Sequence, residues 1–191
     1  RHCTEYGKEI TEKLVADLAA HNVNLVSGLA YGIDICAHKA ALKFDIQNIA
    51  VLAHGLDRIY PNQHKSIVER LQQNGAIVSD FKSGTNPDRQ NFPSRNRIVA
   101  GMTDATIVIE SAVSGGALIT ADIANSYNRD VYAFPGRVDD EYSKGCLQLI
   151  KNHKANLVTD ARDIIEYMNW DLDSKQKKQE SVQSQLFIEL T

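Results

Sequence analysis

Short apolar segments alternate with stretches of helical periodicity along nearly the whole chain. The segment Ile49–Ala53 is apolar at every position, which is typical of a parallel strand whose two faces are both covered. Each segment of this kind is followed, after a short connection, by a helical pattern. The repetition predicts a doubly wound α/β domain with a mostly parallel sheet and helices on both faces.

The apolar segments and the helical patterns give a full set of expected elements. Strands are expected at Asn24–Ser27, Ile49–Ala53, Ala76–Ser79, Thr106–Glu110, Val131–Phe134 and Asn156–Val158. Helices are expected at Glu5–Ala20, Ile33–Lys43, His64–Gln73, Arg95–Met102, Ala117–Tyr127, Lys144–Asn152 and Ala161–Met168. In sheets of this class, ligands bind beyond the carboxyl ends of the strands, so the loops after the strands are the first places to search for a site.

The connection after the third expected strand leads into an arginine-rich segment, Phe92–Gly101. Arg95 and Arg97 are two residues apart and cannot share one helical face. We expect them to flank the start of a helix, where unpaired backbone N–H groups favour an anion. With Arg89 upstream and the ring of Phe92 beside them, these side chains suit a nucleotide, which has a charged phosphate and a flat base.

The overall charge does not by itself indicate a nucleic-acid partner, since the net charge is −3 and the sequence pI is about 6.1. A nucleic-acid site would therefore be a local basic patch on an acidic surface. The stretch 81–101 has such a surplus, although a solvated loop with ordinary surface arginines would look the same. Its charged residues are Lys82, Arg89, Arg95 and Arg97 against Asp88.

Two glycine turns follow expected strands. Ser27 and Gly28 open the turn that ends at Gly32, and its backbone amides resemble a phosphate cradle, although the spacing is not that of a dinucleotide site. Gly115 and Gly116 open a helix after the fourth strand. They either supply amides for a neighbouring phosphate or allow a helix to pack tightly on the sheet.

For other polar residues, a structural role explains the sequence at least as well as a catalytic or metal-binding role. Asp34 and His38 lie on one helical face, and two ligands are too few for a metal site, so an anchoring contact is favoured. Glu110 is either a catalytic carboxylate or a hydrogen-bonding one. The cysteines are scattered and odd in number, which argues against zinc or a disulfide framework. No segment has the length and apolar character of a membrane span or signal peptide, and we expect a cytoplasmic protein.

Many ordered stretches of the chain closely resemble the DNA-processing protein A family, also called the Smf family. The resemblance extends from about Arg1 to Met168. The matching stretches are Ser27–Asp34 with Ala37 and His38, Gly55–Asp57 with Tyr60 and Pro61, Phe92–Gly101, Glu110, Gly116–Thr120, Pro135–Gly136 and Lys144–Cys146.

This resemblance implies an extended Rossmann-like domain that binds single-stranded DNA and forms a homodimer. It implies a role in natural transformation, in which the protein protects incoming single strands and helps to load a RecA-type recombinase. No catalytic turnover and no cofactor are expected. The family's Gly-Ser-Arg motif is represented only by Arg1. The basic and aromatic contacts carry over to Arg89 and Phe92, and Arg95 and Arg97 would line or buttress the same pocket, with Tyr31 as a second candidate for stacking a base.

The resemblance also suggests how the chain is organised. We expect the DNA-binding domain over residues 1–170, beginning after the family's first strand, then a polar linker over 171–184 and the start of a winged-helix-like module over 185–191. The alternative is an enzyme, a nucleotide phosphoribohydrolase of the Rossmann-like group once labelled lysine decarboxylases. That group starts a helix with Pro-Gly-Gly-x-Gly-Thr, of which the stretch Ser114–Thr120 lacks the proline, the third glycine and the adjacent threonine.

Overall fold

The computed structural model describes residues 3–170. The chain divides into two compact units, with the division between Thr159 and Asp160. Arg1, the expected linker over 171–184 and the expected start of a further module over 185–191 lie outside the described residues. Among the described residues, no helix combines the length and the apolar composition needed to cross a membrane.

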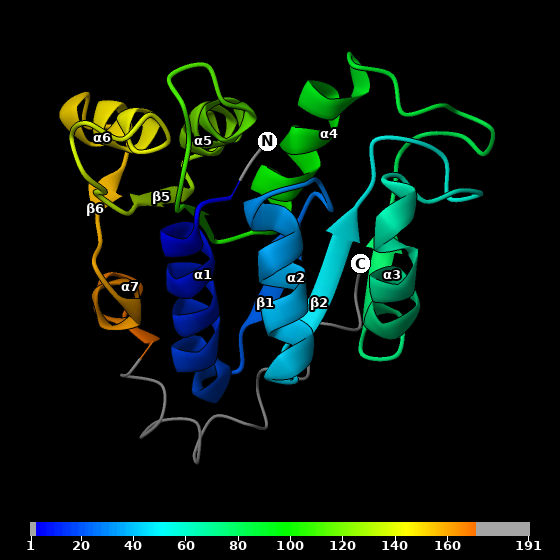
Figure 1. The fold of residues 1–191 in the computed structure, drawn as a ribbon, viewed down its shortest axis with the longest axis horizontal. Helices are drawn as coiled ribbons and strands as arrows, with labels where there is room; N and C mark the ends of the chain where they lie inside the picture. Colours follow the sequence, from blue (N-terminus) through cyan, green and yellow to red (C-terminus); the bar gives the residue numbers. More distant parts are fainter. Residues whose placement is uncertain (1–2, 171–191) are drawn as a thin grey trace. The chain divides into compact units, whose positions relative to one another are not determined.

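The first unit is an α/β structure with parallel strands, as predicted (Figure 1). Its strands form two three-stranded sheets, in the orders β1-β2-β3 and β4-β5-β6. The first holds β1 (Asn24–Ser27), β2 (Gln47–Val51) and β3 (Gly75–Val78), and the second holds β4 (Ala105–Val108), β5 (Asp130–Ala133) and β6 (Asn156–Leu157). In a single doubly wound sheet β1 and β4 would be neighbours, whereas within residues 3–170 they do not pair.

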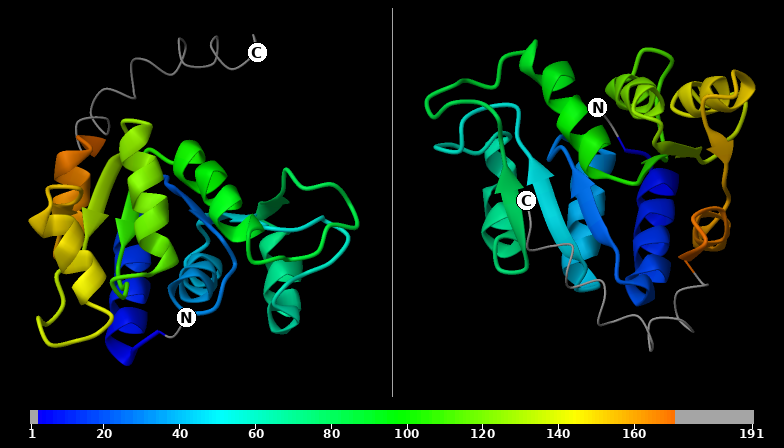
Figure 2. Two further views of the ribbon diagram at one scale, coloured as in Figure 1. Left: turned by 90° about the horizontal axis from the view of Figure 1, so that it is seen from above. Right: turned by 180° about the vertical axis from the view of Figure 1, so that it is seen from behind.

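The helices of the first unit lie on both sides of the strands. In the left view of Figure 2, α4 and α5 lie on the side opposite to α1 and α2. The helices are α1 (Glu5–Leu18), α2 (Ile33–Lys43), α3 (Lys65–Leu71), α4 (Asn91–Met102), α5 (Gly116–Ser126) and α6 (Lys144–Lys151), with short 3-10 turns η1 (Ala19–His21) and η2 (Asn62–His64).

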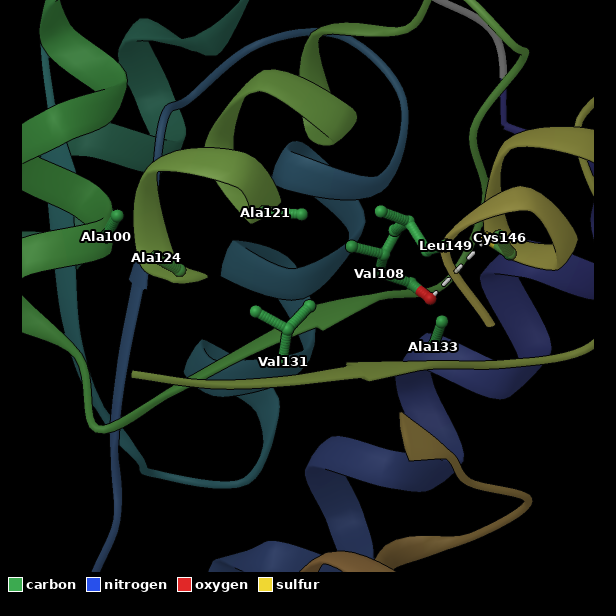
Figure 3. Packing of buried hydrophobic residues seen from close by; sticks show 8 residues of the cluster. All are labelled: Ala100, Val108, Ala121, Ala124, Val131, Ala133, Cys146 and Leu149. Atoms are coloured by element: carbon green, nitrogen blue, oxygen red, sulfur yellow. Dashed lines mark hydrogen bonds between the residues drawn. The ribbon is translucent and has the colours of Figure 1, made fainter. Parts of the chain in front are cut away.

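Small apolar side chains let these helices approach the sheets closely. Over the second sheet, Ala121 and Ala124 of α5 pack on Val108 and Val131 (Figure 3). The Cys146 thiol of α6 donates to the Val108 carbonyl at 3.6 Å. Over the first sheet, α2 and α3 bury a cluster of Leu29, Ile35, Ala50, Leu52, Val68 and Leu71. A third cluster joins α1 to α2 through Val15, Ala40, Ala41 and Ile46.

Helix α7 (Ala161–Tyr167) belongs to the second unit. Its N-cap is Asp160, whose Oδ1 accepts hydrogen bonds from the backbone N–H groups of Arg162 and Asp163 at 2.9 and 3.3 Å. A carboxylate at this position satisfies amides that have no partner within the helix and complements the helix dipole.

The expected bounds are confirmed for β1 and α2 and are close for most other elements. The clearest difference is α4, which begins at Asn91, four residues before the predicted start at Arg95. Pro93 is the third residue of the helix. Its missing N–H costs nothing there, because the first four N–H groups of a helix have no intrahelical acceptor.

Candidate nucleic-acid interface

The loop between β3 and α4, together with the first turn of α4, places Arg89 and Phe92 at the carboxyl edge of the first sheet. Arg89 is exposed and Phe92 is half-buried. An open hollow at this point is lined by Asp88, Arg89, Gln90 and Pro93. A guanidinium beside a partly exposed ring, in an open hollow, can hold a phosphate and an unpaired base.

Arg95 lies in the interior of α4 and not at its start, so the expectation that it flanks the helix start is wrong. Its side chain is buried, with 3% of its surface exposed. Nη1 donates to the carbonyl of Gly28 at 2.6 Å and also to the carbonyl of Val51, and Nε donates to Asn96 Oδ1 at 3.2 Å. Arg95 therefore fastens α4 to the carboxyl ends of β1 and β2, and it buttresses the interface.

Arg97 points to the other side of the helix, as its spacing from Arg95 predicts. It is exposed and forms an ion pair with Asp80, which follows β3. Exposed ion pairs contribute about 0–1 kcal/mol, so a phosphate can replace Asp80 at small cost. Between these two arginines, Asn96 Nδ2 donates to the carbonyl of Gly116 at 3.4 Å. Three consecutive residues of α4 thus contact the turn after β1, the first residue of α5 and the loop after β3.

The DNA contacts of Ser27 and Gly28 stay predictions, but two amides of the turn after β1 already have an acceptor within the chain. Asp34 Oδ2 accepts the backbone N–H of Gly28 at 3.1 Å and that of Ala30 at 3.2 Å. The amides that were expected to face an anion are therefore closed by a carboxylate of the same chain. Gly28 is needed for another reason, because a Cβ there would overlap the Arg95 guanidinium. Ser27, at the end of β1, is half-buried.

In the second glycine turn, one glycine serves close packing and the other is placed to offer amides to a phosphate. The Gly115 N–H donates to the carbonyl of Ala112 at 3.0 Å, and a Cβ on Gly115 would overlap Ser111 Oγ, so this glycine serves close packing. Gly116 is exposed, is the first residue of α5 and has open space around its Cα. Of the two, Gly116 is the one placed to present a helix N-terminus to an anion.

The structural interpretations of Glu110 and Asp34 are confirmed. Glu110 Oε2 accepts the backbone N–H of Thr4 at 3.1 Å, and Oε1 accepts its hydroxyl. The same hydroxyl accepts the N–H of Gly7 at 3.0 Å and caps α1. In α2, the carboxylate of Asp34 closes the preceding turn, whereas His38 is buried. Residues 3–170 contain no group of three or more potential metal ligands.

Sequence reasoning assigned no role to Tyr60, which lies beside the predicted pair. Tyr60 has 45% of its surface exposed, and its ring centroid is 6.2 Å from that of Phe92, with an angle of 58° between the rings. The only signal in the sequence was the Tyr60-Pro61 pair in the loop after β2. Its partner is 32 residues further on, and the contact depends on how two loops meet.

Asp57 holds those two loops together. Its Oδ1 accepts the N–H of Gly84 at 2.7 Å, and its Oδ2 accepts from Arg58 Nε and Nη2 at 2.9 and 2.7 Å. These donors, with the Gly84 amide first, lower the pKa of Asp57 to about 2. A second link runs from the Gly55 N–H to the carbonyl of Thr85 at 3.1 Å. The carboxylate of Asp57 is therefore ionised at neutral pH and can accept these hydrogen bonds. The loops after β2 and β3 are joined at Asp57–Gly84 and at Gly55–Thr85.

Comparison with known proteins identifies relatives of this chain. Protein Smf of Synechocystis sp. is 44% identical over 152 residues, which cover 80% of this chain and 38% of that protein. DNA processing protein DprA of Streptococcus pneumoniae is 39% identical over 165 residues, which cover 86% of this chain and 58% of that protein. The chain thus spans between about two fifths and three fifths of the length of these relatives.

Two solved structures share the fold. DNA processing protein A of S. pneumoniae superposes with a TM-score of 0.79 at 38% identity, over 86% of this chain and 57% of that one. DNA processing protein A of Helicobacter pylori, described for its single-stranded DNA binding mode, gives a TM-score of 0.78 at 27% identity, over 88% of this chain and 76% of that one. The predicted Rossmann-like fold class is confirmed by these structures. Residues 1–169 match the family described as DNA recombination-mediator protein A, and the chain belongs to that family.

Proposed function

We propose that this chain binds single-stranded DNA at the carboxyl edge of its first sheet, with Arg89 on a phosphate and Phe92 under a base. The observations that carry the proposal are the exposed Arg89 in the lining of the open hollow and the half-buried ring of Phe92 three residues further on, in the first turn of α4. The printed description of the H. pylori relative, which names a single-stranded DNA binding mode, supports it. Stacking of a base on an aromatic ring contributes about 1–3 kcal/mol and depends little on sequence.

Further contacts are assigned by position. Arg97 lies next to the hollow on the exposed side of α4, and its exposed ion pair with Asp80 yields readily to a phosphate. The N-terminus of α5 at Gly116 offers amides to a neighbouring phosphate. Arg95 acts indirectly by holding α4 on the strands. Arg1 remains a proposed contact that lies outside the described residues.

We also propose the wider role that the family suggests. The chain would protect single strands in natural transformation and load a RecA-type recombinase on them, as a cytoplasmic homodimer without catalytic turnover. Three measurements test these parts one at a time. They are nuclease protection of a bound oligonucleotide, growth of recombinase filaments in the presence of the chain, and the mass of the chain in solution by light scattering.

Binding itself is tested with a labelled oligothymidine and a duplex of equal length. The proposal expects binding of the single strand, weakening as salt rises because counterions are released, and much weaker binding of the duplex. Equal binding of both would contradict the proposed site. Incubation with a nucleoside monophosphate examines the hydrolase alternative, and release of free base would favour that enzyme instead.

A further inference from the structure

We propose that Tyr60 is a second stacking platform for single-stranded DNA, next to Phe92, and that Tyr31 continues the same path. This inference rests on the proposed function. Tyr31 and Tyr60 lie on the loops that follow β1 and β2, and Phe92 lies at the end of the connection that follows β3, in the first turn of α4. Because the strands lie in the order β1-β2-β3, the loops carry Tyr31, Tyr60 and Phe92 across the edge in the order of the strands.

Both tyrosines present a large part of their side chains to solvent. Tyr31 has 43% and Tyr60 has 45% of its surface exposed. The ring centroids of Tyr60 and Phe92 are 6.2 Å apart, so these two rings lie within reach of neighbouring nucleotides of one strand. Aromatic faces in such a row, beside a basic side chain, are the feature that binds unpaired strands without reading their sequence.

The loop that carries Tyr60 is fixed at several points. Pro61 is buried, and its carbonyl accepts the N–H of His64 at 3.0 Å. His64 is buried as well, and its Nδ1 lies 2.9 Å from the carbonyl of Leu29 in the turn after β1. Since Asp57 also ties the same loop to Gly84, the backbone that carries Tyr60 is held in place before any ligand arrives. A pre-organised platform loses little entropy on binding.

The same segment positions Tyr31. Its hydroxyl donates to Gln63 Oε1 at 2.7 Å, and its ring meets that of His64 edge-on, with the centroids 5.0 Å apart. The turn after β1 and the loop after β2 are therefore joined by the contacts of Tyr31 with Gln63 and His64. Tyr31 is thus tied to the segment that directly follows Tyr60 and Pro61.

The geometry of Tyr60 and Phe92 also explains why the ligand is unpaired. At 6.2 Å and 58°, the rings are too close and too tilted to hold one base between them. They offer two separate surfaces, farther apart than the roughly 3.4 Å rise of stacked bases. Neighbouring bases that lie on both rings must be unstacked from each other, which a duplex resists and a single strand allows.

The test uses the full 191-residue chain and fluorescently labelled oligothymidine. Tyr60→Leu removes the ring but keeps an apolar side chain, and Tyr60→Phe keeps the ring. We expect Tyr60→Leu to weaken binding by about 5- to 150-fold, the range that one stacked base supplies, and Tyr60→Phe to bind nearly as the unaltered chain does. The matched control is Tyr127→Leu, since Tyr127 is 47% exposed at the opposite end of α5 from Gly116.

The outcomes separate this inference from the proposed function. If Phe92→Ala weakens binding and Tyr60→Leu does not, Tyr60 is no platform although the site stands. If the unaltered chain binds no oligothymidine, both fail. Photo-crosslinking of the unaltered chain with an oligonucleotide that carries 5-iodouracil gives a second readout that needs no variant. A cross-link on Tyr60 supports the platform, and cross-links confined to Phe92 overturn it even if Tyr60→Leu misfolds.

Discussion

The guanidinium of Arg95, on α4, donates to the main-chain carbonyl of Gly28 at the end of β1, 67 residues away in sequence. The same Nη1 also donates to the carbonyl of Val51 at the end of β2. One buried cation thereby sets how far the binding helix lies from the two strands. The neighbouring arginine on the helix, Arg97, makes no such contact with the strands among the described residues and pairs with Asp80 on the surface.

This difference predicts unequal costs for two otherwise similar substitutions. Arg95→Ala should lower the free energy of unfolding by about 2–5 kcal/mol, because buried carbonyls lose their donors and a cavity remains. Arg97→Ala should change it by at most about 1 kcal/mol, because an exposed ion pair contributes little. Urea denaturation of both variants measures the difference. Similar losses in the two would contradict the structural role of Arg95.

Substitutions at the hollow should weaken DNA binding and have little effect on the stability of the fold. Arg89→Ala and Phe92→Ala should both weaken oligothymidine binding while leaving the unfolding midpoint within a few degrees of the original. If Arg89 holds a phosphate, its loss should also reduce the slope of log affinity against log salt by about 0.7, the value for one contact to a single strand. Phe92→Ala should leave that slope unchanged. Unchanged affinity in both variants would refute the assignment of the hollow.

Asp57→Ala should loosen the loops after β2 and β3 without removing any proposed contact to DNA. The Gly84 amide and the Arg58 guanidinium would lose their acceptor. We expect faster tryptic cleavage after Lys82 and Arg89, together with weaker DNA binding, because an unfixed platform must be ordered by the ligand. Asp104→Ala breaks an exposed pair with Arg129 elsewhere and should change neither. Equal cleavage rates would show that the tie is dispensable.

His38 predicts a specific loss of stability in acid. Burial lowers the pKa of His38 below 6.5, and its side chain is fully buried against Asn48, with Nδ1 2.6 Å from Asn48 Oδ1. Asn48 Nδ2 donates to the His38 carbonyl at 3.0 Å, so Oδ1 faces the ring and Nδ1 must carry the proton. Nε2 is buried without a hydrogen-bond partner. Protonation in acid would place an unpaired N–H there.

The direction of this pH effect follows from the difference between the pKa of His38 in the folded chain and its pKa in the unfolded chain. A histidine whose pKa is lowered by folding gives full stability above about pH 6.5, and the stability is lost as the pH falls from there toward the folded-state pKa. Between pH 6.5 and 5.5 the free energy of unfolding should fall by up to about 1 kcal/mol from this group. The measurement is urea unfolding at several pH values. His38→Gln should flatten this part of the profile, and an identical profile would assign the effect to other groups.

Cys3 and Cys36 predict a selective thiol reaction. Their sulfur atoms are 3.7 Å apart. Burial, the nearby Cys36 and Glu110 raise the pKa of Cys3 to about 12, and burial raises that of Cys146 to about 11. Because the thiolate is the form that reacts, the raised pKa of Cys3 should make its alkylation in the folded chain slow at pH 8. The oxidant diamide should join Cys3 to Cys36 and leave Cys146 reduced, as peptide mapping can show.

The sequence predicted the order of elements well because that order depends on local patterns. The bounds of α2 agree since Gly32 directly precedes it and permits a backbone φ of 93° that few other residues adopt. The start of α4 was placed four residues late, because a residue before proline, here Phe92, disfavours helical backbone.

The site was harder to predict because its contacts join distant loops. Arg89 and Phe92 were found as a local cluster. That Asp34 fills the turn at Gly28 could not be read from sequence, since the same residues suit an open cradle. The burial of Arg95 and the approach of Tyr60 to Phe92 likewise depend on how the ends of the strands are arranged in three dimensions. The local charge indicated a basic patch. It did not indicate which arginine would donate to backbone carbonyls of the chain itself and which would be exposed.

The contact between Thr4 and Glu110 has a consequence for how the chain is made. It joins residues 106 positions apart, so the amino-terminal cap of α1 cannot be completed until the ribosome has synthesised β4. At about 5–20 residues per second, the first helix waits roughly 5–20 s for its carboxylate. During that interval α1 is held by its apolar contacts with α2 and by the ion pair between Glu12 and Lys43, and the contact of its cap with Glu110 is added later.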